Sequence, residues 1–348
     1  MQLSERILTQ RELNRALLAR QLLLERGRMP IPRALERIGG IQAQYAPAMY
    51  LGLLSRLTGF ARDDLTRALE RKTVIQATLM RTTIHLVSRA DYWPVAVAIR
   101  ARRWARARVY KTSEREFERA ASEVRRLLKS AGPLRDRQIG ERLGKETWRP
   151  GVDLWVELVR VPPSGTWAHR RADLYGLAED WVGPEDSTPE AGLELLVRRY
   201  LQGFGPARAS DIANWAGLNV TAIKPALESL ELRQFRDEAG KVLLDLPRAP
   251  LPDPDTPAPP RFLPVWDANL LVHARRTQIV PEEYRPRIFN TKTPHSFNTF
   301  LIDGQVAGTW RYEGGRMALS PFHRIDPRWR RELDEEGERL AAFHRAGS

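Results

Sequence analysis

The segment FGPARASDIANWAGLNVTAIKPALESLELRQFRDEAGKVLLDL, residues 204–246, predicts one complete structural unit. Two helical patterns, DIANWA and VTAIKPALESLE, are separated by a short turn at 217–219. The following LRQFRDEAGKVLLDL predicts two short strands around a turn at Ala239-Gly240. A helix, a tight turn, a second helix and a strand hairpin form, in this order, a winged helix, a module that often binds DNA.

The beginning of this unit occurs a second time, earlier in the chain. AGPLRDRQIGERLG, which starts at Ala131, has the same frame of Gly-Pro-x-Arg, then three residues, then Ile. The matched positions are Gly132, Pro133, Arg135 and Ile139 in the first copy, and Gly205, Pro206, Arg208 and Ile212 in the second. LWVELVRVPPSGTWAHRR follows the first copy and again predicts strand, turn and strand. The repeat therefore predicts two winged-helix units.

The residues before the repeat predict a third unit. Thr9-Gln10-Arg11-Glu12 is a capping-box sequence that opens the helix RELNRALLARQLLLER, and PRALERI and APAMYLGLLSRL predict two more helices. VIQATLMRTTIHLV, residues 74–87, then predicts a strand with Arg81, Thr83 and His85 on its polar face. Three helices followed by strands match a winged helix, so we count three units in tandem.

The C-terminal part has a different pattern. Residues 247–260, PRAPLPDPDTPAPP, form a proline-rich connector, and RFLPVWDANLLV and TFLIDGQVAGTW after it predict strands, with a hairpin at Asp303-Gly304. We therefore predict an α+β fold, mostly helical, with three tandem winged-helix units and a β-rich C-terminal region. The predicted divisions are 1–112, 113–190, 191–247, 248–260 and 261–348.

The composition excludes several classes of protein. The chain has no cysteine, so disulfides, thiolate metal sites and a cysteine nucleophile are excluded, and its six histidines form no metal-binding pattern. We therefore expect no metal and no cofactor. The N-terminus lacks an apolar signal core and no apolar run is long enough to span a bilayer, so we expect a cytoplasmic protein without membrane contact.

The charge indicates a polyanionic partner. Lys and Arg together number 56 against 43 Asp and Glu, giving a net charge of +13. The segment IRARRWARARVYK, residues 99–111, contains six cations and no acid, which favours a phosphate backbone over a merely solvated surface. Arg100, Arg103 and Arg106 are the DNA contacts predicted from it. A compositional bias toward arginine, from the genome or from heat adaptation, is the alternative explanation of the overall charge.

Two glutamines, Gln42 and Gln44, lie between predicted helices in GGIQAQYAP, residues 39–47. Pro47 disfavours a helical conformation at the preceding residue. In an extended segment, residues i and i+2 point to the same side. Both amides can therefore face one target while Ala43 faces the core. The alternative is that both side chains only hydrogen-bond the bend between the helices.

Seven segments together resemble the AlkZ-type DNA glycosylases of bacteria. These are LNRALLARQLLLER, IQAQ, RTTIHLV, VRVPPSGTW, GFGPARASDIANWAGL, LPVWDANLLVHARR and TFLIDGQVAGTW, in order along almost the whole chain. The resemblance implies a C-shaped clamp of winged helices with a basic concave face. It also implies hydrolysis of the N-glycosidic bond of alkylated purines, chiefly N7-alkylguanine, and in some members the unhooking of interstrand crosslinks. IQAQ resembles the Gln-x-Gln branch, which makes Gln42 and Gln44 the expected catalytic residues.

The chemistry fits such a pair. An N7-alkylguanine already carries a positive charge and leaves readily, so two neutral amides that position a water can suffice. We expect a monofunctional enzyme that acts as a monomer on double-stranded DNA containing alkylated bases. The alternative is a winged-helix DNA-binding protein or transcriptional regulator without catalysis, in which both glutamines are structural.

Other candidates are assigned to DNA binding. Arg81, Thr83 and His85 could line the site or grip phosphate, and His85 could equally make only a structural hydrogen bond. Asp267 is either a catalytic carboxylate or a buried partner of arginine, and His273 is similarly open. The remaining candidates for DNA contacts are Trp167, Arg170, Lys292, His295 and the Asp303-Gly304 hairpin. For Trp167, packing in the core is the alternative.

Overall fold

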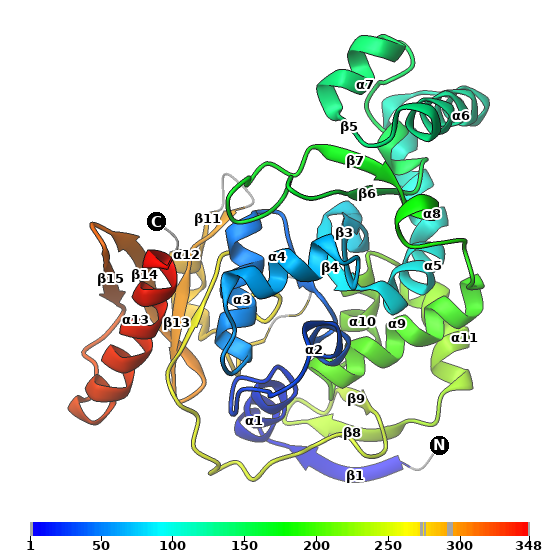
Figure 1. Ribbon diagram of the computed structural model, residues 1–348. Helices are drawn as coiled ribbons and strands as arrows, with labels where there is room; N and C mark the ends of the chain where they lie inside the picture. Colours follow the sequence, from blue (N-terminus) through cyan, green and yellow to red (C-terminus); the bar gives the residue numbers. More distant parts are fainter. Residues whose placement is uncertain (1–2, 272–273, 275, 291–294, 347–348) are drawn as a thin grey trace.

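The computed structural model describes residues 3–271, 274, 276–290 and 295–346. Figure 1 shows a main body from which helices α6 and α7 project at one end, with the strands of the C-terminal region along one side. The predicted fold class is confirmed, because winged-helix units precede a β-rich C-terminal region. No helix in the described ranges is long and apolar enough to cross a membrane.

The first unit runs from residue 31 to residue 88. Its elements in order are α2 (Ile31–Ile38), β2 (Ile41–Gln42), α3 (Ala46–Arg56), α4 (Arg62–Glu70), β3 (Val74–Thr78) and β4 (Ile84–Ser88). β4 pairs antiparallel with both β2 and β3. The three helices of this unit are therefore α2, α3 and α4, and not the three that the sequence suggested. α1 (Gln10–Arg20) precedes the unit and begins with the predicted capping box at Thr9.

The prediction of one continuous strand over residues 74–87 was wrong. The chain reverses in the short helix η1 (Met80–Thr82), where Arg81 and Thr82 have φ angles of 54° and 58°. Non-glycine residues rarely adopt this left-handed conformation, and threonine favours strands, so the sequence carries no turn signal here. As a consequence, Arg81 lies in the turn and does not share a strand face with His85.

The second unit repeats the order with one helix shortened. After α5 (Arg89–Ala107) and η2 (Arg108–Tyr110), its elements are α6 (Glu114–Ala131), β5 (Leu134–Arg135), α7 (Asp136–Leu143), η3 (Val152–Leu154), β6 (Leu158–Arg160) and β7 (Leu174–Leu177), followed by α8 (Ala178–Trp181). β7 pairs with both β5 and β6, as β4 does with β2 and β3. Because β3 also pairs with β6, the two units share one six-stranded sheet.

The third unit is the segment that the sequence predicted most completely. It contains α9 (Pro189–Phe204), α10 (Ala209–Ala216), α11 (Val220–Ser229), β8 (Arg233–Asp237) and β9 (Val242–Asp245). A bridge between Ala207 and Leu244 occupies the place of β2 and β5 in the other units. The sequence did not predict β1 (Leu3–Leu8), which pairs parallel with β8 and ties the N-terminus to this unit.

The C-terminal region is built on a four-stranded antiparallel sheet. Its strands are β10 (Arg261–Leu263), β13 (Thr299–Ile302), β14 (Gln305–Glu313) and β15 (Arg316–Pro321). The other elements are η4 (Glu282–Tyr284), α12 (Arg285–Ile288), β11 (Phe289–Asn290), β12 (His295–Ser296), η5 (Pro327–Trp329) and α13 (Arg330–Arg345).

The Asp303-Gly304 turn between β13 and β14 was predicted correctly, and its role in contacting DNA remains a prediction. Asn14 donates a hydrogen bond to the Gly304 carbonyl at 2.8 Å, and Arg15 forms an ion pair with Asp303. A Cβ atom on Gly304 would lie 2.5 Å from the Asn14 side chain. The turn is therefore packed against α1, which argues against the expectation that it probes DNA.

Candidate active site

The two glutamines lie one residue apart and differ in their exposure to solvent. Gln42 belongs to β2 opposite His85 and is buried, whereas Gln44 is exposed. Between them, Ala43 is 1% exposed and its amide donates to the Ile84 carbonyl at 2.7 Å. The inward direction of Ala43 is as predicted. The prediction that both amides face one target is not confirmed, because β2 ends at Gln42 and the chain bends at Gln44. The pair presents one amide inside the protein and one at the surface.

The orientation of both amides follows from their partners. Arg81 donates from Nη2 to Gln42 Oε1 at 2.9 Å, and the Ile84 backbone N–H donates to Gln44 Oε1 at 3.2 Å. A guanidinium and a backbone N–H can only donate, so in each glutamine the oxygen must face this partner. Each amide therefore keeps its NH₂ group and one lone pair of the oxygen for other partners.

Arg81 connects the glutamine pair to the third unit. Its guanidinium also donates to the Trp215 carbonyl in α10, and a Cβ atom on Gly217 would lie 2.9 Å from its backbone nitrogen. Within the described ranges, no carboxylate forms an ion pair with Arg81. Burial lowers the pKa of Arg81 to about 10, and nearby Arg276 acts in the same direction. At neutral pH, Arg81 therefore remains a partly buried cation bonded to neutral groups.

His85 lies beside Arg81 and its side chain is buried, with 2% of the residue exposed. Its Nδ1 lies 2.9 Å from the Thr83 carbonyl, which can only accept, so Nδ1 carries the proton. Nε2 is then an acceptor and lies 3.5 Å from Nη2 of Arg81. Burial lowers the pKa of His85 to about 3, with a further contribution from the charge of Arg81. His85 is thus a neutral structural partner, which contradicts its assignment to DNA contact.

Thr83 is half-buried and points back into the same turn. Its hydroxyl donates to the Met80 carbonyl at 3.1 Å, and its own carbonyl accepts from His85. Both groups stabilise the reversal of the chain at η1. Of the three residues predicted on one polar face, the structure brings Arg81 and His85 to Gln42 and uses Thr83 to shape the turn.

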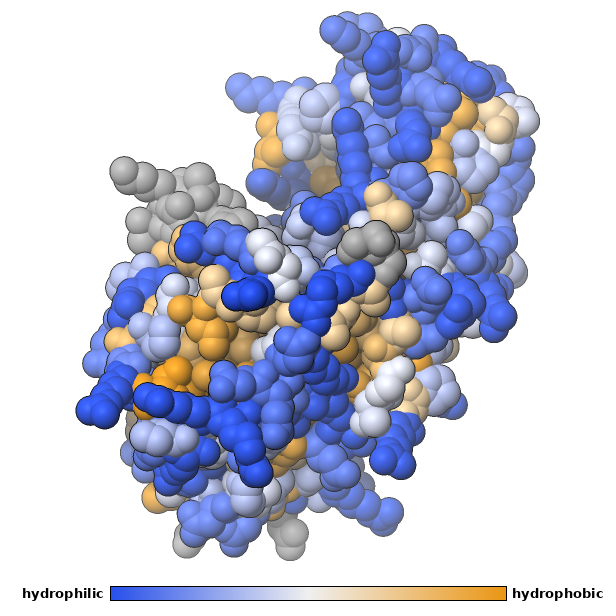
Figure 2. Space-filling model, turned by 60° about the vertical axis from the view of Figure 1, so that its left-hand side comes forward, coloured by the Kyte–Doolittle hydropathy of each residue, from blue (hydrophilic) through white to orange (hydrophobic). Residues whose placement is uncertain are grey.

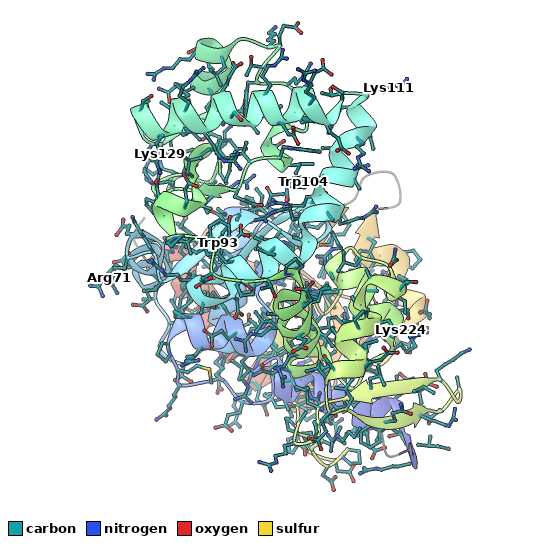
Figure 3. The ribbon with its side chains drawn as sticks, turned by 90° about the vertical axis from the view of Figure 1, so that its right-hand side faces the viewer. Arg71, Trp93, Trp104, Lys111, Lys129 and Lys224 are labelled. Atoms are coloured by element: carbon teal, nitrogen blue, oxygen red, sulfur yellow. The ribbon has the colours of Figure 1, made fainter. Side chains whose placement is uncertain are left out.

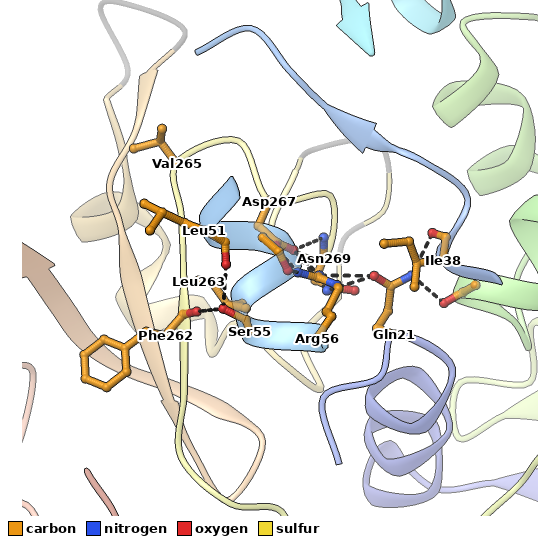
Figure 4. A network of polar contacts seen from close by, with 12 residues as sticks. Gln21, Ile38, Leu51, Ser55, Arg56, Phe262, Leu263, Val265, Asp267 and Asn269 are labelled. Atoms are coloured by element: carbon orange, nitrogen blue, oxygen red, sulfur yellow. Dashed lines mark hydrogen bonds and ion pairs between the residues drawn. The ribbon is translucent and has the colours of Figure 1, made fainter. Parts of the chain in front are cut away.

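A second arginine, Arg56, lies at the cavity that Gln42 lines. This small cavity of about 10 Å³ is lined by both Gln42 and Asp267. Figure 4 shows Asp267 facing Arg56. Nη1 of Arg56 lies 2.9 Å from Oδ2 of Asp267, and Nη2 lies 3.1 Å from Oδ1. Both side chains are buried. Arg56 also donates to Gln21 at 3.2 Å. Asp267 is therefore a buried partner of arginine, which is one of the two roles considered for it.

The basic helix α5 is less available to DNA than its sequence indicated. Arg103 is 3% exposed and pairs with Glu157 at 2.6 Å, so its assignment to DNA contact was wrong. Arg100 pairs with Glu157 and with Glu185. Figure 3 shows Trp104 where α5 passes from the body to the projecting unit, and Arg106 on this part of the helix is exposed. The acids that neutralise Arg100 and Arg103 come from other segments of the chain.

Trp167 and Arg170 lie in the loop between β6 and β7. Trp167 packs edge-on against Phe343 at 5.5 Å, and the Arg62 guanidinium lies 4.2 Å from its ring centroid. Packing, the alternative role, therefore describes Trp167 better than free stacking. Arg170 is exposed and donates to the hydroxyl of Tyr45 at 3.2 Å. Tyr45, directly after Gln44, was missed in the sequence, although an aromatic residue beside the motif was a usable signal.

Three further candidates cannot be placed. Lys292 and His273 lie outside the described residues, and of His295 only the backbone in β12 is described. Their predicted roles remain predictions.

Three winged-helix units and a net charge of +13 are typical of DNA-binding proteins. The family model for AlkZ-like DNA glycosylases matches residues 35–343, and the chain belongs to this family. It is therefore a DNA glycosylase. Among solved structures, Streptomyces sahachiroi DNA glycosylase AlkZ is similar to it, with a TM-score of 0.80, 17% sequence identity and coverage of 97% of each chain. This likeness shows that the two proteins share a fold. No curated protein matches the chain.

Proposed function

We propose that this protein hydrolyses the N-glycosidic bond of cationic N7-alkylpurines in double-stranded DNA, with Gln42 and Gln44 positioning the water. The observation that carries the proposal is the ion pair of Asp267 with Arg56. Among the described residues, Asp267 is the one carboxylate that lines the Gln42 cavity, and Arg56 already neutralises its charge. A site without a free carboxylate or general acid suits a base that brings its own positive charge.

The geometry of the amides supports this role. The remaining lone pair of a glutamine oxygen can accept a hydrogen bond from water, which leaves a lone pair of the water free for attack on the sugar carbon. Arg81 holds the Gln42 oxygen, so that amide is fixed before substrate binds. Such preorganised positioning can lower a reaction barrier by several kcal/mol, on the order of 7–11 kcal/mol in the best cases.

We further propose a monofunctional enzyme that acts as a monomer. A bifunctional enzyme would need an amine nucleophile, and no lysine is found among the described residues that line the Gln42 cavity. The proposed substrates include bulky and crosslinked N7-alkylpurines. Gln44 is exposed at the surface, so a large group attached to the base need not be buried beside it.

The test is base release from duplex DNA that contains N7-methylguanine. We expect Gln42→Ala and Gln44→Ala each to slow single-turnover release by about 100-fold, a loss typical of a misplaced reactant. DNA binding should persist in both variants. The matched control is Gln10→Ala, which removes an exposed glutamine from α1.

Release at the wild-type rate by both glutamine variants would exclude the catalytic role. If the wild-type protein binds the duplex but releases no base, the non-catalytic DNA-binding alternative is correct. A duplex with an N7-linked interstrand crosslink, assayed for strand separation, tests whether unhooking belongs to the same site.

A further inference from the structure

A second and larger pocket adjoins the glutamine pair. It has a volume of about 260 Å³ and is lined in part by Tyr45, the neighbour of Gln44. Ala48, Pro264 and Val265 line both this pocket and the cavity of Gln42, so the two share a wall. A volume slightly below the ~300 Å³ lower bound of drug-sized sites is suited to one aromatic ring system. Any group bound here would lie next to the proposed reacting centre.

The pocket walls are aromatic and come from separate parts of the chain. Tyr312 stacks on His344 with ring centroids 4.2 Å apart, and Trp167 meets His344 edge-on at 5.4 Å. The indole of Trp310 donates to the carbonyls of Leu263 and Thr299, at 3.1 and 3.0 Å, which fixes its ring. Aromatic walls that are already held by packing and hydrogen bonds favour a flat ligand that stacks or meets them edge-on.

Hydrophobic side chains also reach the surface on this side of the molecule. Figure 2 shows orange hydrophobic patches between strongly hydrophilic ones on the face that carries the C-terminal sheet. Tyr45 is 41% exposed, and Arg170 at the pocket is exposed as well. The pocket is therefore reachable from solvent at the end where these two residues meet.

The charges of the pocket select against a cation. Arg170 is the one charged group among its described lining residues, and no carboxylate is present there. His344 adds no charge at neutral pH, because burial lowers its pKa to about 4, with Arg62 and Arg170 acting in the same direction. In the part of the chain that the structure describes, the guanidinium of Arg170 donates to the Tyr45 hydroxyl alone, and a guanidinium has five donor N–H groups. A ligand with an acceptor atom can use them.

We propose that this pocket, beside the glutamine pair, binds an uncharged, planar aromatic group carrying a hydrogen-bond acceptor. The inference rests on the proposed function. Two sources share this chemistry. One is an aromatic substituent of a bulky adduct. The other is the released base, because cleavage of the cationic nucleoside by water yields a neutral alkylpurine, a sugar hydroxyl and a proton.

The direct test uses free bases and requires no catalysis. Quenching of tryptophan fluorescence is titrated with 7-methylguanine and with 7-benzylguanine, in the wild-type protein and in Tyr45→Ala and Arg170→Gln. We expect saturable binding in the wild type that is at least tenfold weaker in both variants. The control is Arg171→Gln, because Arg171 is an adjacent arginine that pairs with Asp173 and does not line the pocket.

The two ligands distinguish the sources. Equal weakening for both bases assigns the pocket to the purine itself, whereas weakening for 7-benzylguanine alone assigns it to the substituent. In the second case, Tyr45→Ala should slow release from N7-benzylguanine DNA at least fivefold more than release from N7-methylguanine DNA. Absence of binding by the wild type, or equal binding by all four proteins, overturns the proposal. Because these titrations do not depend on base release, they remain decisive even if the proposed glycosylase substrate is wrong.

Discussion

Arg56 and Arg81 are two largely buried arginines that each hydrogen-bond a glutamine, yet their surroundings differ. Arg56 has a carboxylate partner in Asp267, and Gln21 completes the network by donating to two backbone carbonyls. Arg81 is bonded to the Gln42 amide and to the Trp215 carbonyl, with the neutral His85 beside it. The first network is neutral in total charge, and the second carries a net positive charge.

The difference in net charge between the two networks indicates that one stabilises the fold and the other serves the candidate site. A buried ion pair holds parts of a fold together, because removing either partner leaves an uncompensated charge. A buried cation without a carboxylate is costly, and so is the left-handed backbone of Arg81, so both persist only where the surrounding structure enforces them. We therefore infer that Arg56 stabilises the protein and that Arg81 orients Gln42. The following predictions test this division, from the largest effect to the smallest.

Replacing Asp267 by alanine should destabilise the protein strongly. The substitution leaves the Arg56 guanidinium buried without its partner, for which a loss of about 3–5 kcal/mol in the free energy of unfolding is expected. Urea denaturation measures this loss. The double variant Arg56→Met/Asp267→Leu should recover a large part of it. If Asp267→Ala is as stable as the wild type but inactive, Asp267 belongs to the catalytic machinery and the division fails.

Replacing Arg81 by glutamine should reduce activity and leave stability nearly unchanged. We expect single-turnover base release to fall by about 10- to 100-fold, because Gln42 loses the donor that fixes its amide. The free energy of unfolding should change by less than about 1 kcal/mol, since the lost hydrogen bonds are offset by removal of a desolvated charge.

The control for this variant is Arg102→Gln. Arg102 donates to the Gly217 carbonyl, close to the backbone contact of Arg81, but it is exposed and does not touch Gln42. Its replacement should leave release unchanged. Equal rates for the Arg81 and Arg102 variants would show that the Arg81 contact does not position the amide.

The neutral state of His85 predicts a pH dependence of stability. The folded pKa of about 3 lies below the ordinary histidine pKa of 6.5, so between these values the unfolded chain binds a proton that the folded protein excludes. Stability attributable to His85 is therefore full above pH 6.5 and is lost as the pH falls, at about 1.4 kcal/mol per pH unit.

The measurement compares unfolding free energies at pH 5 and pH 6 in the wild type and in His85→Gln, in which this part of the slope should disappear. The matched control is His169→Gln, which removes an exposed histidine. An NMR titration in which the imidazole of His85 becomes protonated near pH 6 would contradict the assignment.

The smallest effect concerns DNA affinity. Arg106 is exposed on α5 and forms no ion pair within the described residues, whereas Arg108, also exposed, is paired with Glu114. If Arg106 contacts a phosphate, Arg106→Gln should weaken binding of any duplex and reduce the slope of log K against log salt by about 1. Arg108→Gln should reduce it less. Equal salt slopes for both variants and the wild type would remove Arg106 from the interface.

Local sequence determined much of the architecture. The third unit, the capping box at Thr9, the Asp303-Gly304 turn and the extended path around Ala43 all follow from short-range rules, because capping, turn chemistry and periodicity act between residues close in the chain. The reversal at Arg81 and Thr82 was missed, since no local signal marks it and the packing of this turn on Gly217 in the third unit accompanies it.

The identity of the glutamine motif was visible in the sequence, and its partners were not. Arg103 looks like a phosphate-binding residue until Glu157 is brought against it from another segment. Asp267 looks like a possible base until Arg56 is found beside it. The sequence by itself determined which units form and which residues carry the motif. Only the tertiary structure decided which charges are neutralised, because electrostatic and desolvation energies depend on distance in space and on burial, and sequence separation fixes neither.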